Sequence, residues 1–122
     1  MDIKEKIHEL FRTIDEMDSD KFITFLTDDA QFRFGNAPAV QGKSAIRDAV
    51  AGFFGTIKSI SHKDVNLWVN PDSVLYEGEV TYTRHDGSTL TIPFFNKFGI
   101  LGNKIKDYFI YIDITLLYTP AN

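Results

Sequence analysis

The stretch KIKDYFIYIDITLLY, residues 104–118, decides how the rest of the sequence is interpreted. Isoleucine and aromatic residues recur in it with a period of two, which predicts a β-strand. One face of this strand would carry Asp107, Phe109, Tyr111 and Asp113, and the other Tyr108, Ile110, Ile112 and Ile114. The two carboxylates of the first face either point to water or line a cavity, and the functional prediction depends on which of these holds.

Composition narrows the class of protein. The 122 residues fit a single domain, 1–122, and a net charge of −4 without a basic cluster argues against a nucleic-acid partner. The chain has no cysteine, so disulfides and thiolate metal ligands are excluded. No apolar run reaches the ~20 residues of a membrane span, and the N-terminus lacks the apolar run of a signal peptide. We therefore expect a cytoplasmic protein without a membrane partner.

The first half of the chain has helical periodicity. Apolar residues between Ile3 and Met17 recur at helical spacing, which predicts an amphipathic helix of about four turns. A second, short helix should begin at Asp18 or Ser19 as N-cap, and residues 30–34 should form a short strand. After a loop at residues 35–38, Gly42 opens a third helix.

From residue 59 onward the period changes from 3.6 to two. Four strands are predicted, at residues 59–70, 73–84, 89–100 and 104–118, separated by short breaks with turn-forming residues. Such short connections make neighbouring strands antiparallel. Helices followed by an antiparallel meander predict an α+β fold.

Few residue types in this chain can carry chemistry. The histidines, His8, His62 and His85, show no metal-ligand spacing and are interpreted as surface or strand-edge residues, so we predict neither a metal nor a cofactor. Carboxylates remain, because burial in an apolar cavity raises their pKa and makes them useful acids or bases. From the residues alone, however, Glu77 and Glu79 belong to the water-facing side of their strand. Its obvious core face is Val74, Tyr76, Val80 and Tyr82.

The order of local motifs resembles the nuclear transport factor 2-like superfamily. The motifs are Asp28-Asp29-Ala30, residues 42–47 (GKSAIR), Asp86-Gly87 and residues 104–113. This superfamily includes ketosteroid isomerase, SnoaL-like polyketide cyclases and limonene epoxide hydrolase. The resemblance implies a cone-shaped barrel in which three N-terminal helices pack inside a strongly curved, mostly antiparallel sheet. It further implies an apolar pocket and a homodimer through the convex sheet face. With the core-like face of residues 73–84 buried between subunits, Glu79 and Thr81 would face the pocket.

Two family members suggest roles for individual residues. The catalytic carboxylates of ketosteroid isomerase fall on Phe34 and Phe94, which cannot exchange a proton, so that mechanism is not expected. The phrases Phe34-Gly35-Asn36-Ala37-Pro38 and Asp107-Tyr108-Phe109 are similar to limonene epoxide hydrolase. This similarity implies Asp107 as base, Asn36 as the group that orients water, and Glu79 as a protonated partner. The groups that protonate the epoxide oxygen in that family are missing here, because its arginine and acidic aspartate fall on Glu79 and Thr81.

The predicted site thus combines these three residues with a set that would contact the ligand. The expected ligand-contacting residues are Phe34, Thr81, Phe53, Trp68, Phe94, Tyr111 and Asp113. Three functions stay open: an enzyme that performs acid–base chemistry (hydrolase, isomerase or cyclase type) on a small hydrophobic molecule, a protein that binds such a molecule without turnover, and a structural or interaction protein with a filled pocket.

Overall fold

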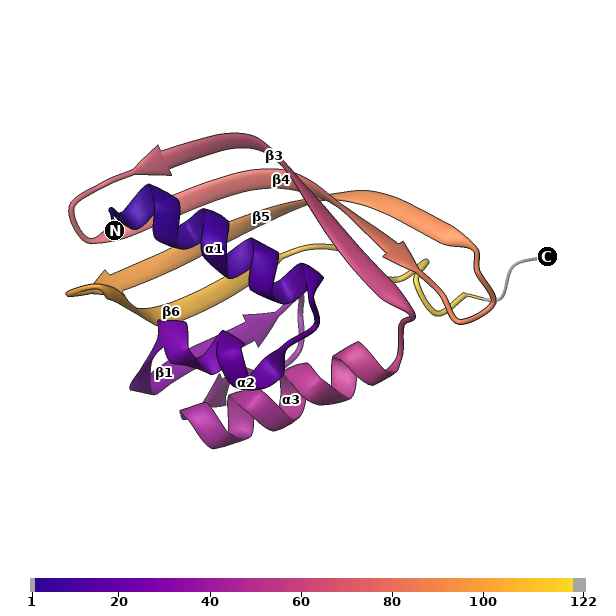
Figure 1. Ribbon diagram of the computed structural model, residues 1–122, viewed down its shortest axis with the longest axis horizontal. Helices are drawn as coiled ribbons and strands as arrows, with labels where there is room; N and C mark the ends of the chain where they lie inside the picture. Colours follow the sequence, from indigo (N-terminus) through magenta and orange to yellow (C-terminus); the bar gives the residue numbers. More distant parts are fainter. Residues whose placement is uncertain (1, 120–122) are drawn as a thin grey trace.

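The computed structural model describes residues 2–119 (Figure 1). Helices occupy α1 (Ile3–Asp15), α2 (Ser19–Phe22), the 3-10 turn η1 (Ile23–Phe25) and α3 (Lys43–Gly55). Strands occupy β1 (Leu26–Phe34), β2 (Val40–Gln41), β3 (Ser59–Val69), β4 (Ser73–Thr83), β5 (Thr89–Leu101) and β6 (Lys104–Tyr111). The three predicted helices and the four strands of the meander are confirmed, and β2 is an additional short strand that the sequence did not predict.

Side-chain caps fix where the first two helices begin. The carboxylate of Asp2 accepts a hydrogen bond from the backbone N–H of Glu5 at 2.8 Å, and Asp18 accepts one from Lys21 at 2.9 Å. Each cap satisfies a backbone donor that the first turn of a helix leaves unpaired. Asp18 is therefore the N-cap of the second helix.

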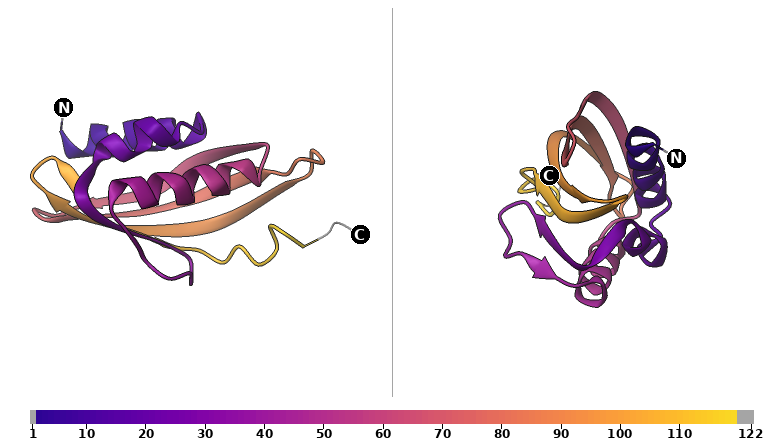
Figure 2. Two further views of the ribbon diagram at one scale, coloured as in Figure 1. Left: turned by 90° about the horizontal axis from the view of Figure 1, so that it is seen from below. Right: turned by 90° about the vertical axis from the view of Figure 1, so that its left-hand side faces the viewer.

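The strands form one curled sheet in the order β2-β1-β6-β5-β4-β3. All neighbours are antiparallel except β1 and β6, which run parallel. The helices lie together on the concave side of the sheet, and the curl is open rather than closed (Figure 2). The predicted α+β cone is confirmed, although the sheet does not close into a barrel.

The faces of β4 show which side of the sheet is the core. Tyr76 is buried on the concave side, and its ring stacks on Phe11 of α1 with the ring centroids 4.3 Å apart. The other buried residues of that side are Val74, Val80 and Tyr82. The expectation that this face is buried between subunits is therefore wrong, because these side chains form the core beneath the helices.

Gly78 lets the concave face of β4 pack closely against its neighbours. A Cβ atom at this position would lie 2.6 Å from the carbonyl oxygen of Lys63 and 2.9 Å from a ring carbon of Phe94. Such distances are well inside van der Waals contact, so only glycine fits here. The Phe94 ring lies in the space that a larger residue at position 78 would fill.

The strand at the end of the chain is shorter than predicted. β6 ends at Tyr111, and residues 112–119 continue as an irregular segment with a turn. Asp113 lies in this segment, where its carboxylate accepts hydrogen bonds from the backbone N–H and the hydroxyl of Thr115. Asp113 is thus a turn residue and not part of the strand. No helix among residues 2–119 has the length and apolar character to cross a membrane.

Candidate functional site

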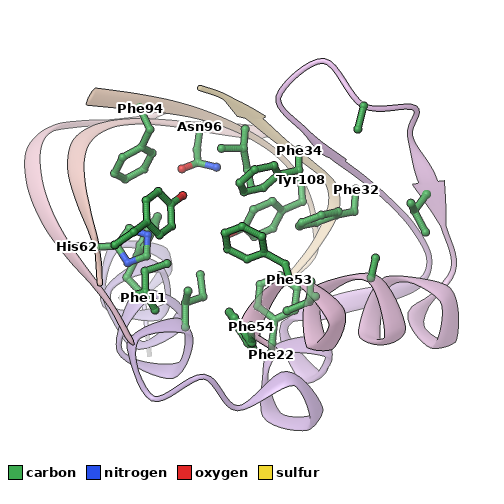
Figure 3. Close-up of a pocket in the computed structure, with 18 of the residues that line it drawn as sticks. Phe11, Phe22, Phe32, Phe34, Phe53, Phe54, His62, Phe94, Asn96 and Tyr108 are labelled. Atoms are coloured by element: carbon green, nitrogen blue, oxygen red, sulfur yellow. The ribbon is translucent and has the colours of Figure 1, made fainter. Parts of the chain in front are cut away.

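A cavity of about 200 Å³ lies between the concave face of the sheet and the helices (Figure 3). Its lining consists of Phe11, Ile14, Phe22, Phe32, Phe34, Ala37, Pro38, Val40, Ala49, Val50, Phe53, Phe54, Ile60, His62, Tyr82, Phe94, Asn96, Tyr108 and Ile110. Only four of these side chains, His62, Tyr82, Asn96 and Tyr108, carry a polar group. An apolar lining with a few convergent polar groups is typical of a small-molecule site.

The cavity opens at one end and is lined by aromatic rings at the other. The exposed members of the lining are Ala37 and Pro38 in the β1–β2 loop and Ala49 on α3. The opening therefore lies between this loop and α3. At the opposite end the ring of His62 packs against the rings of Phe11 and Phe94, with centroid distances of 4.9 Å and 5.3 Å (Figure 3).

His62 is held by a carboxylate at the end of the first helix. Its Nδ1 lies 2.6 Å from Oδ1 of Asp15, and its backbone N–H donates to Oδ2 of the same carboxylate at 3.3 Å. Because an ionised carboxylate only accepts hydrogen bonds, Nδ1 carries the proton. In the tautomer with the proton on Nδ1, the lone pair of the ring is on Nε2, which has no hydrogen-bond partner among residues 2–119.

A second histidine–aspartate pair joins the same two elements at the surface. His8 of α1 lies with its Nε2 3.6 Å from Oδ2 of Asp64 on β3, and both side chains are well exposed. The side chain of His62 is only 9% exposed, and it lines the cavity. Both pairs connect α1 to the edge strand β3, but only the pair of Asp15 and His62 reaches the interior.

Two tyrosine hydroxyls complete the polar lining. Burial raises the pKa of Tyr108 above its ordinary value, and nearby Tyr76 and Tyr82 add to the effect. Burial likewise raises the pKa of Tyr82. Both phenols therefore stay protonated at neutral pH, where they can donate a hydrogen bond to an oxygen atom in the cavity.

The structure separates the predicted site residues into two groups. Phe34, Phe53 and Phe94 line the cavity. The other predicted residues, Asp107, Asn36, Glu79, Thr81, Trp68, Tyr111 and Asp113, do not line it.

Asp107 lies on the convex side of the sheet, so the expectation that it faces the pocket is wrong. It pairs with Gly99 of β5, and a Cβ atom at Gly99 would lie 2.6 Å from its Oδ2. The carboxylate thus covers Gly99 on the outer face. Since side chains alternate along a strand, its neighbour Tyr108 points inward.

The same alternation places Glu79 and Thr81 outside. Glu79 is exposed, and the hydroxyl of Thr81 is 2.8 Å from that of Thr91 on the neighbouring strand. Asn36 is an exposed residue of the β1–β2 loop, next to the cavity opening. The predicted grouping of Asp107, Asn36 and Glu79 around one pocket is therefore wrong.

Trp68 also lies outside, because β3 contains a bulge. The register between β3 and β4 shifts between Asp64 and Asn66, which reverses the side on which the following residues point. Trp68 is 45% exposed and its ring lies 6.3 Å from that of Phe95 on the convex side. Tyr111 and Asp113 line a shallow groove of the outer surface and not the cavity.

The sequence did not single out His62, Asp15, Asn96, Tyr82 or Tyr108 as site residues. One signal for His62 is present in the sequence, since it lies two residues after the apolar Ile60 and therefore on the same face of the strand. Its partner Asp15 is 47 residues away and has no local signal. Among residues 2–119, no group of three or more His, Asp or Glu side chains is arranged to hold a metal ion.

The sequence matches a known protein family, and the fold matches solved structures. Residues 7–108 match the model of the SnoaL-like domain. No curated protein matches the sequence significantly. Solved structures with the same fold include an uncharacterised cystatin-fold protein of Novosphingobium aromaticivorans, at 21% identity and a TM-score of 0.79, covering 92% of this chain and 99% of that one.

Two further solved structures have names that suggest catalysis. A putative polyketide cyclase of Xanthomonas campestris pv. campestris shares 16% identity, with a TM-score of 0.85 over 94% of this chain and 93% of that one. An LEH-like epoxide hydrolase of M. tuberculosis shares 14% identity, with a TM-score of 0.76 over 88% and 80% of the two chains. Identities this low establish the fold alone. Because the family model spans most of the sequence, the chain belongs to the SnoaL-like domain family.

Proposed function

We propose that this protein binds a small apolar molecule in the cavity and performs acid–base chemistry on it, with His62 as the proton acceptor. The hydrogen bond between Asp15 and Nδ1 of His62 is the observation that carries the proposal. It fixes the tautomer in which Nε2 is free to accept a proton, and it places a negative charge next to the imidazolium that results. The cyclase and epoxide hydrolase among the structural neighbours support a catalytic role in general terms.

The proton transfer has a simple course. Nε2 of His62 takes a proton from a C–H or O–H group of the ligand, and the electron pair of the broken bond stays on the ligand. When that bond is a C–H next to a carbonyl group, the negative charge moves to the carbonyl oxygen, to which a hydroxyl such as that of Tyr108 can donate a hydrogen bond. The imidazolium then returns the proton to the ligand, so His62 is regenerated.

Exchange of carbon-bound hydrogen tests this proposal without knowledge of the natural substrate. The probe is 8-hydroxy-2-tetralone, a two-ring ketone whose hydroxyl lies next to an enolisable C–H, incubated in D2O and followed by mass spectrometry. We expect the protein to accelerate deuterium uptake over buffer, and His62→Gln to reduce the protein-dependent rate by about 100-fold or more. His8→Gln is the matched control, because it removes the surface pair and leaves the cavity intact. An unchanged rate in His62→Gln would contradict the proposal.

Binding without turnover is the second candidate. Fifteen of the nineteen lining side chains are apolar, which favours tight retention of an apolar molecule. Denaturing mass spectrometry of the natively purified protein distinguishes the two functions. A single small molecule that co-purifies and is returned unmodified after hours with the protein would favour binding.

We also propose that the convex sheet face pairs with a second copy of this chain. The face exposes Trp68 and Tyr111. The guanidinium of Arg33 lies 5.5 Å from the ring centroids of both Phe109 and Tyr111, and its Nε is buried without a partner among the described residues. The same strands carry charges of both signs, among them Lys63, Glu79 and Lys97, so charge does not oppose pairing of the face with a copy of itself.

A further inference from the structure

Asn96 is a buried polar residue of the cavity lining. It lies on β5 opposite Tyr76 of β4 and Ile110 of β6, and it is only 1% exposed. Burial of an amide is costly unless its polar atoms find partners. Because Asn96 lies in the middle of an apolar concave face, both its NH2 group and its side-chain oxygen need a hydrogen-bond partner.

The amide has one end fixed by the backbone. Its Nδ2 donates a hydrogen bond to the carbonyl oxygen of Phe109 at 3.3 Å. Only the NH2 group of the amide can donate to a carbonyl, so this contact assigns which end is nitrogen. The side-chain oxygen, Oδ1, is consequently turned toward Phe94 and the end of the cavity that holds His62 (Figure 3).

Oδ1 is the unpaired end of the Asn96 amide. It has no hydrogen-bond partner among residues 2–119, and the side chain of Asn96 is part of the cavity lining. Because the Nδ2 end is held by the backbone of Phe109, Oδ1 is the end that is left for a molecule in the cavity. Oδ1 can only accept a hydrogen bond.

We propose that Asn96 Oδ1 accepts a hydrogen bond from a hydroxyl or N–H group of the ligand, and that the cavity therefore selects apolar molecules that carry such a donor. The inference rests on the proposed function, since it concerns the ligand of the same cavity. His62 presents a second acceptor, Nε2, at the same end. A ligand with only a carbonyl, ether or methyl group there leaves Oδ1 desolvated and unpaired, whereas a hydroxyl pairs with it.

Matched probes measure this selection directly. 2-Naphthol and 2-methylnaphthalene have the same two-ring body, and only the first carries a donor. Equilibrium dialysis at neutral pH gives the dissociation constant of each probe for the full chain. We expect 2-naphthol to bind about tenfold or more tightly than 2-methylnaphthalene, and Asn96→Leu to abolish this preference.

Two further variants keep the result interpretable. His62→Phe removes the imidazole acceptor and should retain the preference for 2-naphthol. Asn96→Val serves in place of Asn96→Leu if the latter fails to fold, which far-ultraviolet circular dichroism checks. A β-branched residue suits the strand and likewise lacks an acceptor.

The outcomes separate this inference from the function on which it rests. If the wild type binds both probes equally, or if the Asn96 variant keeps the preference, Asn96 only anchors β5 to β6 and the inference is overturned while the binding cavity stands. Loss of the preference in His62→Phe alone assigns it to His62 and also overturns the inference. If neither probe binds the wild type, both the inference and the proposed cavity function fail.

Discussion

His62 and Asp15 join the edge strand of the sheet to the last turn of the first helix by two hydrogen bonds, of which the side-chain bond measures 2.6 Å. The arrangement makes His62 the most suitable proton acceptor of the cavity. It also makes Asp15 a positioning residue, because it contacts His62 and not the cavity itself.

Asp15→Asn should therefore slow proton transfer without removing the base. An asparagine can offer its NH2 group to Nδ1, which favours the opposite tautomer and leaves Nε2 protonated. We expect the exchange rate of the tetralone probe to fall by about tenfold or more, with little change in probe affinity. A fall in affinity with an unchanged rate of exchange in the bound state would instead mark Asp15 as a purely structural residue.

Asp107→Asn should leave proton transfer unchanged. The carboxylate of Asp107 covers Gly99 on the convex face, separated from the cavity by the sheet. The exchange assay on this variant, run beside His62→Gln, compares the two faces of the sheet. Loss of exchange in Asp107→Asn would mean that the inner face of β6 has been assigned wrongly.

Gly78→Ala should destabilise the fold. The added methyl group would collide with the backbone of Lys63 and with the ring of Phe94, which costs about 1–3 kcal/mol. Gly52→Ala in α3 is the control, since a Cβ there would meet no atom within 4 Å beyond its chain neighbours and the backbone of its own helix, and alanine favours a helix. Urea denaturation should show a lower midpoint for Gly78→Ala and an equal or higher one for Gly52→Ala.

Stability should decline at alkaline pH because of the buried tyrosines. Burial raises the pKa of Tyr108, so the folded state keeps this proton at a pH at which the unfolded chain, with an ordinary pKa of about 10, releases it. The unfolded state then binds fewer protons, and the free energy of unfolding falls as pH rises above about 10. Urea denaturation at a series of pH values from about 8 to about 11 gives the free energy of unfolding, which should decline less steeply with pH in Tyr108→Phe than in the wild type. An equally steep decline in that variant would place the effect elsewhere.

A homodimer through the convex face should depend on its exposed rings. Trp68→Asp places a charge among Phe95 and its neighbours, and a desolvated charge opposes association. Sedimentation velocity should show a dimer for the wild type and a monomer for this variant. A monomeric wild type at high concentration would contradict the proposed pairing.

The order of helices and strands followed from the sequence because each signal is local. The helical spacing after Ile3, the N-cap at Asp18 and the period-two strands after residue 59 all reappear in the structure. The alternation of β4 also indicated which side is the core. The family resemblance implies instead that this face is buried in a dimer, whereas the structure shows that it packs against the helices of the same chain.

The site was harder to predict because it depends on packing between distant segments. Asp15 and His62 meet only when the end of α1 lies against β3. The bulge between Asp64 and Asn66 contains no glycine or proline that would indicate it in the sequence, so period-two spacing predicts Trp68 on the same face as His62. A single extra residue reverses every side chain that follows, which period-two reasoning cannot detect.

The most direct test of the central claim is chemical rescue of His62→Ala. We predict that this variant loses the protein-dependent deuterium exchange of 8-hydroxy-2-tetralone and regains it in proportion to added imidazole, while the wild type gains nothing beyond the reaction of imidazole in buffer. A His62→Ala variant that exchanges the probe as fast as the wild type would contradict the claim that His62 is the base.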